Sequence, residues 1–205
     1  MLRKPINLFL NTELHRYNAL KDAGLESALN DAATLFGTKS VSIQGHSAGG
    51  ACAVLMAFEV KRNAFPGYSL STVNFDMHEV LAFIGSLSVI RFIDSLFQVT
   101  TFGCPRVGNS EFTAAFSSLI TSFESTRVTH YRDIVPHMPQ MRLGYHHVYN
   151  EVYYNKESSE YKVCDGSGED AGCSNQCGPL HCVSVADHLL YMNVSLGSDS
   201  CVAQQ

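Results

Sequence analysis

The stretch Val41-Ser-Ile-Gln-Gly-His-Ser-Ala-Gly-Gly50 guides the interpretation of the whole chain. Its first residues alternate between apolar and polar side chains, which predicts a buried β-strand. The motif Gly-x-Ser-x-Gly follows at residues 45–49, and residues 50–60 are rich in Ala, Leu and Met, which favours a helix. A strand, a Ser between glycines and a helix, in this order, are typical of a nucleophile elbow, whose tight turn exposes the Ser hydroxyl. Ser47 is therefore the predicted nucleophile.

The backbone N–H of Ala48 is the predicted partner of the oxygen that becomes negative when Ser47 attacks a carbonyl group. It opens the helix after the turn, and the N–H groups at a helix N-terminus stabilise anions. A Gly/Ser turn without chemistry is the alternative interpretation. The order of strand, turn and helix makes this alternative the weaker one.

The composition predicts a single soluble globular domain over residues 1–205. A chain of 205 residues with 45% hydrophobic and 16% charged residues can bury a sizeable core. The net charge is −5, and the 14 Lys and Arg residues are scattered along the sequence, which argues against nucleic acid as a partner. Residues 80–90 form an apolar run without charge, but a membrane-spanning helix needs about 20 such residues. No transmembrane segment is therefore predicted.

The cysteine content points to an oxidising compartment. Seven cysteines are many for a cytosolic enzyme of this size, and they suggest secretion or the lumen of the endomembrane system. Residues 1–10 have too short an apolar core for a signal peptide. Residues 155–182 form a Cys-rich loop, in which disulfides are the ordinary interpretation. A zinc site is the alternative, since the spacing of its Cys and His residues permits one (Cys173, Cys177, His181 and Cys182). We predict no metal site and no cofactor.

The order of the remaining elements predicts an α/β fold, with a mostly parallel sheet flanked by helices. Residues 69–77 are expected to be irregular, and residues 80–97 remain open between a packed helix, an interfacial segment and an insertion that does not pack. The expected regular elements are a helix over 12–36 with a weak point at Gly24, strands over 98–103, 126–131 and 147–154, a helix capped by Asn109, and a helical pattern over 184–196.

A nucleophilic Ser needs a His as its base and a carboxylate that orients this His. In elbow folds the chain order is Ser, then Asp or Glu, then His. Asp133 fits the second place, because it follows a predicted strand at the edge where open sheets carry their chemistry. Several histidines could be the base: His137, His146, His147, His181 and His188. The pattern favours His188, which follows a long loop, ahead of His147; Asp187 is a poor orienter because adjacent side chains diverge.

Five sequence blocks together resemble the fungal-type class 3 lipases. They are Gly45-His-Ser-Ala-Gly-Gly50, Thr101-Phe-Gly-Cys-Pro-Arg-Val-Gly-Asn109, Tyr131-Arg-Asp-Ile-Val-Pro-His-Met-Pro139, His147-Val-Tyr-Asn-Glu-Val152 and Ala186-Asp-His-Leu-Leu-Tyr191. The resemblance implies an α/β-hydrolase fold and the hydrolysis of carboxylic esters, typically triacylglycerols, so the implied partner is a lipid or other ester at a lipid–water interface. By matching blocks, it makes Ser47 the nucleophile, Asp133 the orienting acid and His188 the base. His146 and His147 then have structural roles.

The chain departs from the family pattern at several places. Ala48 stands where the family has Leu, and Cys104 where a polar residue is usual. Relatives begin with strands and an Arg-Gly-Thr-like loop that supplies a second oxyanion donor, whereas this chain begins at the helix before the nucleophile strand. We therefore expect an N-terminally truncated lipase domain in which residues 62–97 hold an insertion. The alternative functions are an inactive lipase-fold remnant and an esterase acting on soluble or phenolic esters.

Overall fold

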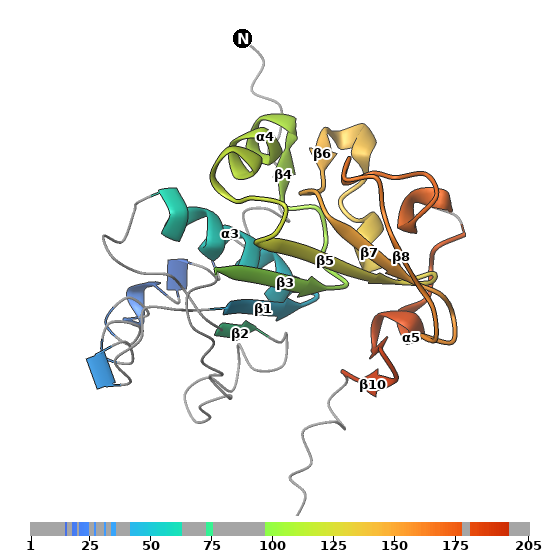
Figure 1. The fold of residues 1–205 in the computed structure, drawn as a ribbon, viewed down its shortest axis with the longest axis horizontal. Helices are drawn as coiled ribbons and strands as arrows, with labels where there is room; N and C mark the ends of the chain where they lie inside the picture. The colour runs from blue at the N-terminus through green and yellow to red at the C-terminus, as the bar shows by residue number, and fades with distance from the viewer. Residues whose placement is uncertain are drawn as a thin grey trace, which may run out of the picture.

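The computed structural model describes residues 42–62, 73–75, 97–177 and 181–196, together with single positions between residues 15 and 35. Its main sheet has six strands in the order β2 (Val73–Phe75), β1 (Ser42–His46), β3 (Gln98–Phe102), β5 (Ser125–His130), β7 (Glu151–Tyr154) and β8 (Tyr161–Val163) (Figure 1). Neighbouring strands from β2 to β7 pair in parallel, and β8 pairs antiparallel with β7. The predicted mostly parallel sheet is confirmed.

Two helices lie on one side of this sheet. Helix α3 (Ala48–Arg62) follows β1, packs on β1 and β3, and is buried along most of its length. Helix α4 (Ser110–Leu119) lies beside α3 (Figure 1). The rings of Phe58 and Phe112 pack between the two helices, with their centroids 5.2 Å apart. Asn109 caps α4 as predicted, since its side-chain oxygen accepts the N–H of Phe112 at 3.0 Å. The core between these helices and the sheet fixes the strand ends that carry the site.

Short elements complete the described chain. A two-stranded ladder joins β4 (Gly108–Asn109) to β6 (Tyr145–His146), and a second joins β9 (Leu190–Tyr191) to β10 (Val194–Ser195). The single-turn helices are η1 (Val135–His137), η2 (Met141–Leu143), η3 (Ser174–Gln176) and α5 (Val185–His188).

The predicted helical pattern over residues 184–196 is wrong beyond His188. Helix α5 ends there, and the chain turns into the β9–β10 hairpin. The two residues between these strands, Met192 and Asn193, have φ values of 49° and 62°. Two successive left-handed residues are typical of the tight turn of a two-residue hairpin, and they cannot continue a right-handed helix. The apolar side chains that suggested the helix are largely exposed.

The predicted strand over residues 147–154 begins only at Glu151. Asn150, at a φ of 63°, breaks the extended backbone just before β7. Its side-chain amide donates to the carbonyl oxygen of Ser125 at 3.2 Å, and its own carbonyl accepts the N–H of Arg127 at 2.8 Å. Asn150 therefore sets the start of the pairing between β7 and β5.

Two further expectations concern segments of which the structure describes only a part. Residues 69–77 are not irregular throughout, because Val73–Phe75 forms β2 at the sheet edge. Within residues 12–36, Ala23 and Gly24 form a turn, so the expected helix is not continuous. The apolar run at 80–90 lies outside the described residues. None of the described helices has the length and apolar character needed to cross a bilayer.

A buried ion pair joins the neighbouring strands β5 and β7. Arg127 Nη2 donates to Glu151 Oε2 at 3.0 Å, and both side chains are almost fully buried. The other carboxylate oxygen, Oε1, accepts the hydroxyl of Thr129 at 2.6 Å and the N–H of Ser174 at 3.1 Å. Arg127 also donates to the carbonyl oxygen of Gly168 at 2.8 Å. The pair thus ties two strands to the loop over residues 164–177.

Replacing Glu151 with alanine should lower the free energy of unfolding by about 3–5 kcal/mol. The buried guanidinium of Arg127 would lose its carboxylate, and the Thr129 hydroxyl and the Ser174 N–H would lose their acceptor. Urea denaturation of the purified variant measures this loss. Lys162→Ala removes an ion pair in which the Lys side chain is half exposed, so its denaturation midpoint should stay close to that of the unaltered chain. Equal free energies of unfolding in the two variants would contradict the prediction that the buried Arg127–Glu151 pair is needed for stability.

Candidate active site

Ser47 occupies the turn between β1 and α3, as predicted. Its φ is 57°, a left-handed conformation that L-residues rarely adopt. Its backbone N–H donates to the carbonyl oxygen of Phe102 at 2.9 Å, which holds the turn against the end of β3. Gly45 is required here, since a Cβ at this position would lie 2.3 Å from the carbonyl oxygen of Gly49. The predicted strand, turn and helix around Ser47 are therefore all present.

Asp133 and His188 meet as a hydrogen-bonded pair, although they are 55 residues apart in the sequence. His188 Nδ1 lies 2.9 Å from Asp133 Oδ2, and both residues are buried, with 5% and 2% of their surface exposed. The second carboxylate oxygen, Oδ1, accepts the N–H of Val135 at 2.8 Å. This carboxylate can hold a His in one tautomer, with the proton on Nδ1.

The backbone around Ser184 brings the two halves of this pair together. The chain after β5 forms a parallel bridge between Asp133 and Ser184, and the N–H of Ser184 donates to the carbonyl oxygen of Arg132 at 3.0 Å. The Ser184 hydroxyl oxygen then caps α5 by accepting the N–H of Asp187 at 3.0 Å. His188 ends α5, so the bridge and the cap fix its position beside Asp133.

His46, directly before Ser47, holds His188 at the elbow. His46 Nε2 donates to the carbonyl oxygen of His188 at 2.8 Å, and the two rings stack with centroids 4.5 Å apart. His188 Nε2 is buried and has no hydrogen-bond partner among the described residues. With Nδ1 occupied by Asp133, Nε2 is the nitrogen that can accept a proton from a neighbouring hydroxyl. The arrangement suits nucleophilic catalysis by Ser47.

Tyr191 belongs to this site as well, although the sequence pattern gave no indication of a role for it. Its hydroxyl donates to Asp133 Oδ2 at 2.5 Å, so this oxygen accepts from both Tyr191 and His188. Burial and the negative charge of Asp133 raise the pKa of Tyr191 well above its usual value. The phenol therefore stays protonated and remains a donor. Tyr191 is a positioning residue, since it acts on the orientation of the carboxylate.

Gly103 is a second residue whose role could not be predicted from the sequence. It follows β3 with a φ of 55°, and it presents bare backbone to the buried pair. A Cβ here would lie 2.7 Å from Asp133 Oδ2 and 2.9 Å from both His188 Nδ1 and the Tyr191 hydroxyl. These distances are shorter than ordinary contacts, so only glycine leaves room for all three side chains.

Gly103→Ala should reduce kcat/KM for an ester substrate by about 100-fold, because a displacement of the Asp133–His188 pair by less than an ångström spoils the proton transfer. Gly144→Ala is a matched control, since Gly144 also has a left-handed φ of 88° but a Cβ there would meet nothing within 4 Å. The control should lose some thermal stability from backbone strain but keep its activity. Equal kcat/KM values for Gly103→Ala and Gly144→Ala would contradict the prediction.

The other histidines weighed as the base lie elsewhere. His147 is buried, and its Nε2 donates to the carbonyl oxygen of Pro136 at 2.7 Å. Burial, together with the positive charges of Arg127 and Arg106, lowers the pKa of His147 well below its usual value, so its ring stays neutral. His181 is exposed, and His146 lies in β6. His147 braces the loop after Asp133, which agrees with the structural role implied by the resemblance.

The cysteines of residues 155–182 form two disulfides, Cys164–Cys173 and Cys177–Cys182. The alternative of a zinc site that includes Cys173 and His181 is not what the structure forms, because Cys173 is bonded to Cys164. Cys52 and Cys104 are buried thiols, and Cys104 lies against α3, where a Cβ at Gly50 would be 3.0 Å from its Cβ.

Comparisons with known proteins find lipases. A family model described as Lipase (class 3) matches residues 10–143. A lipase of Rhizopus niveus is 31% identical over 161 residues, which cover 78% of this chain and 34% of that protein. The secreted mono- and diacylglycerol lipase 1 of Fusarium solani is 32% identical over 151 residues, which cover 70% and 36%. The chain thus spans about a third of the length of these curated relatives.

Solved structures extend the likeness to the fold. A triacylglycerol lipase whose catalytic centre is a serine protease triad superposes with a TM-score of 0.66 and 27% sequence identity, over 96% of this chain and 64% of that chain. This likeness confirms the predicted α/β-hydrolase fold.

Proposed function

Since the chain belongs to the class 3 lipase family, we propose that it hydrolyses the carboxylic esters of lipids, with triacylglycerols as the substrate class. The observation that carries the proposal is the buried hydrogen bond between Asp133 and His188, held beside the Ser47 elbow by His46. We assign Ser47 as nucleophile, His188 as base, Asp133 as orienting acid and the N–H of Ala48 as oxyanion donor.

In this mechanism His188 Nε2 removes the proton of Ser47 while the hydroxyl oxygen attacks the ester carbonyl. Asp133 keeps the other ring proton on Nδ1 and stabilises the imidazolium that forms. The carbonyl oxygen becomes negative and accepts the N–H of Ala48 at the start of α3. The imidazolium then protonates the leaving alcohol, and an acyl-enzyme remains on Ser47. Water, deprotonated by His188, attacks this ester and releases the fatty acid.

We propose that the protein works in an extracellular or lumenal compartment, at a lipid–water interface. Two disulfides support the compartment, as does the relative from Fusarium solani, which is secreted. Exposed apolar side chains around His188 support the interface, because they would leave water on contact with lipid (Val185, Leu189, Leu190, Met192 and Val194). We also propose that residues 1–205 form one domain, with an insertion in residues 62–97 from which β2 joins the sheet.

The test pairs covalent labelling with a substrate series. The purified chain should react with a fluorophosphonate probe, and it should hydrolyse an emulsified triacylglycerol faster than a soluble short-chain ester or a feruloyl ester. The same chain unfolded in guanidinium is the control for both assays and should show neither reaction. Faster turnover of the soluble or phenolic esters would replace the lipase assignment with an esterase. A folded chain that does not label would be a remnant without catalysis.

A further inference from the structure

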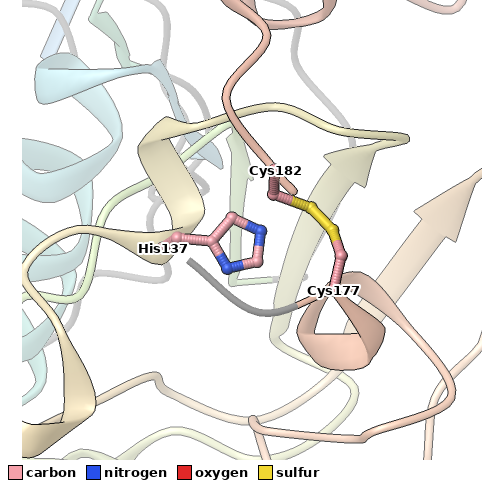
Figure 2. Close-up of side chains that lie close together, drawn as sticks. All are labelled: His137, Cys177 and Cys182. Carbon is pink, nitrogen blue, oxygen red and sulfur yellow. A yellow bond between two sulfur atoms is a disulfide. The ribbon is translucent and has the colours of Figure 1, made fainter. Parts of the chain in front are cut away.

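A histidine outside the proposed catalytic residues lies against a disulfide. His137, in η1, has one ring nitrogen within 4.8 Å of the Sγ atoms of both Cys177 and Cys182, which are bonded to each other as a disulfide. Figure 2 shows a ring nitrogen of His137 turned toward the two sulfur atoms. Once the S–S bond is broken, one imidazole nitrogen and two thiolates can supply three of the four ligands of a tetrahedral zinc site.

The environment of His137 is that of a side chain that could bind a metal ion. Its ring is buried, with 8% of the residue exposed, and Nε2 has no hydrogen-bond partner among the described residues. A buried polar atom without a partner costs free energy, so it needs an explanation. An imidazole nitrogen is a common ligand of Zn²⁺, so a bound cation would give this buried atom its partner.

A second group of this kind in the described chain serves as a contrast. Glu151, Cys164 and Cys173 also place one ligand atom each within 4.8 Å of one another. The Glu151 carboxylate, however, already accepts hydrogen bonds from Arg127, Thr129 and Ser174. A metal there would have to break the buried ion pair, whereas at His137 it would satisfy a free nitrogen.

We propose that reduction of the Cys177–Cys182 disulfide creates a site for a thiophilic divalent cation such as Zn²⁺, formed by Cys177, Cys182 and His137. A phosphine reductant supplies two electrons that break the S–S bond, and water supplies the two protons of the thiols and the oxygen of the phosphine oxide that forms. Binding of the cation releases both thiol protons, and His137 contributes a lone pair. A water molecule is the fourth ligand, because Cys177 is only partly buried.

The site would link the two loops that carry the Asp133–His188 pair. His137 lies four residues after Asp133, and Cys182 lies two residues before Ser184, which bridges to Asp133. The disulfide joins only Cys177 to Cys182, whereas the cation would also hold the loop that follows β5. The inference concerns metal binding by the reduced chain, so it stands apart from the proposed hydrolase activity.

The experiment titrates Zn²⁺ into the full chain after treatment with a phosphine reductant, and repeats the titration with Co²⁺, whose thiolate charge-transfer band reports Cys ligands. The reduced chain should bind one ion with this band, and the oxidised chain should bind none. Cys177→Ser with Cys182→Ser should abolish binding, and His137→Ala should weaken it by at least about tenfold, the low end of what loss of even an outer-shell partner costs.

Two control variants locate the site. Cys164→Ser with Cys173→Ser removes the other disulfide, and His181→Ala removes the exposed His beside Cys182; both should leave binding intact. Loss of binding in either control, or no binding by the reduced chain, would overturn the proposal. If reduction unfolds the chain, Zn²⁺ should restore its circular dichroism in the unaltered chain but not in the Cys177/Cys182 double variant. Failure of that rescue would equally overturn it.

Discussion

Ser47→Ala should abolish fluorophosphonate labelling and lower kcat for ester hydrolysis by about 10⁶-fold, the loss expected when the nucleophile of a catalytic triad is removed. In the proposed mechanism the attacking oxygen belongs to the residue at the elbow, so no other described hydroxyl is expected to take its place. The measurement is a rate assay on a chromogenic ester with the purified variant. An activity within about 100-fold of the unaltered chain would remove Ser47 from the mechanism.

Two controls separate chemistry from folding in this experiment. Ser110→Ala alters an exposed Ser at the start of α4 and should keep full activity. Ser47→Gly should be as inactive as Ser47→Ala but more stable by about 1 kcal/mol, because glycine adopts the φ of 57° without the strain of a Cβ. Two variants of different stability and the same inactivity would show that the loss is chemical.

Asp133→Asn should reduce kcat/KM by about 10⁴-fold while leaving the fold intact, because the amide imposes the wrong tautomer on His188. Oδ1 of Asp133 accepts the N–H of Val135, so the amide oxygen takes that position and the NH₂ group faces both His188 and Tyr191, whose hydroxyl must then accept instead of donating. The amide then donates to Nδ1, the ring proton moves to Nε2, and Nε2 can no longer accept the proton of Ser47. The measurement is kcat/KM on a soluble ester, beside a thermal melt.

Asp187→Asn is the matched control for this prediction. Asp187 is adjacent to His188 in the sequence, but the carboxylate that bonds to the His188 ring comes from Asp133. This variant should retain kcat/KM within about threefold, because Asp187 is not one of the proposed catalytic residues. If Asp187→Asn lost much of its kcat/KM and Asp133→Asn lost little, Asp187 and not Asp133 would be the acid that orients His188.

The sequence predicted the parts of the site that depend on local structure. The elbow at Ser47 could be predicted because its strand, turn, glycines and helix are all contiguous. The sequence pattern alone favoured His188 among five histidines without excluding the others, and the matching of sequence blocks strengthened that preference. The reason is physical: the contact between Asp133 and His188 depends on the bridge at Ser184, which joins segments far apart in the chain.

The residues that were missed all act through long-range packing. Gly103 lies within a motif, but nothing in its neighbours along the sequence indicates that a Cβ would collide with Asp133. Tyr191 is three residues after His188, a spacing that suits a helix, and apolar Leu189, Leu190 and Met192 strengthened that impression. The left-handed turn at Met192 and Asn193 instead folds Tyr191 back onto Asp133. Periodicity cannot distinguish these two outcomes, because the decisive contact lies outside the segment.

The C-terminal segment, residues 184–196, gives the site a stability different from that of the sheet. It carries His188 and Tyr191 but contributes no strand to the main sheet. Its backbone is held by the bridge at Asp133 and by hydrogen bonds from the His46 and His130 rings to its carbonyl oxygens. Such a segment can open as a unit while the sheet and Ser47 stay folded. Amide hydrogen exchange should therefore be fast in residues 184–196 and slow in β1 and β3. On heating, catalysis would then end well before the sheet melts, and cooling would restore it without refolding of the core.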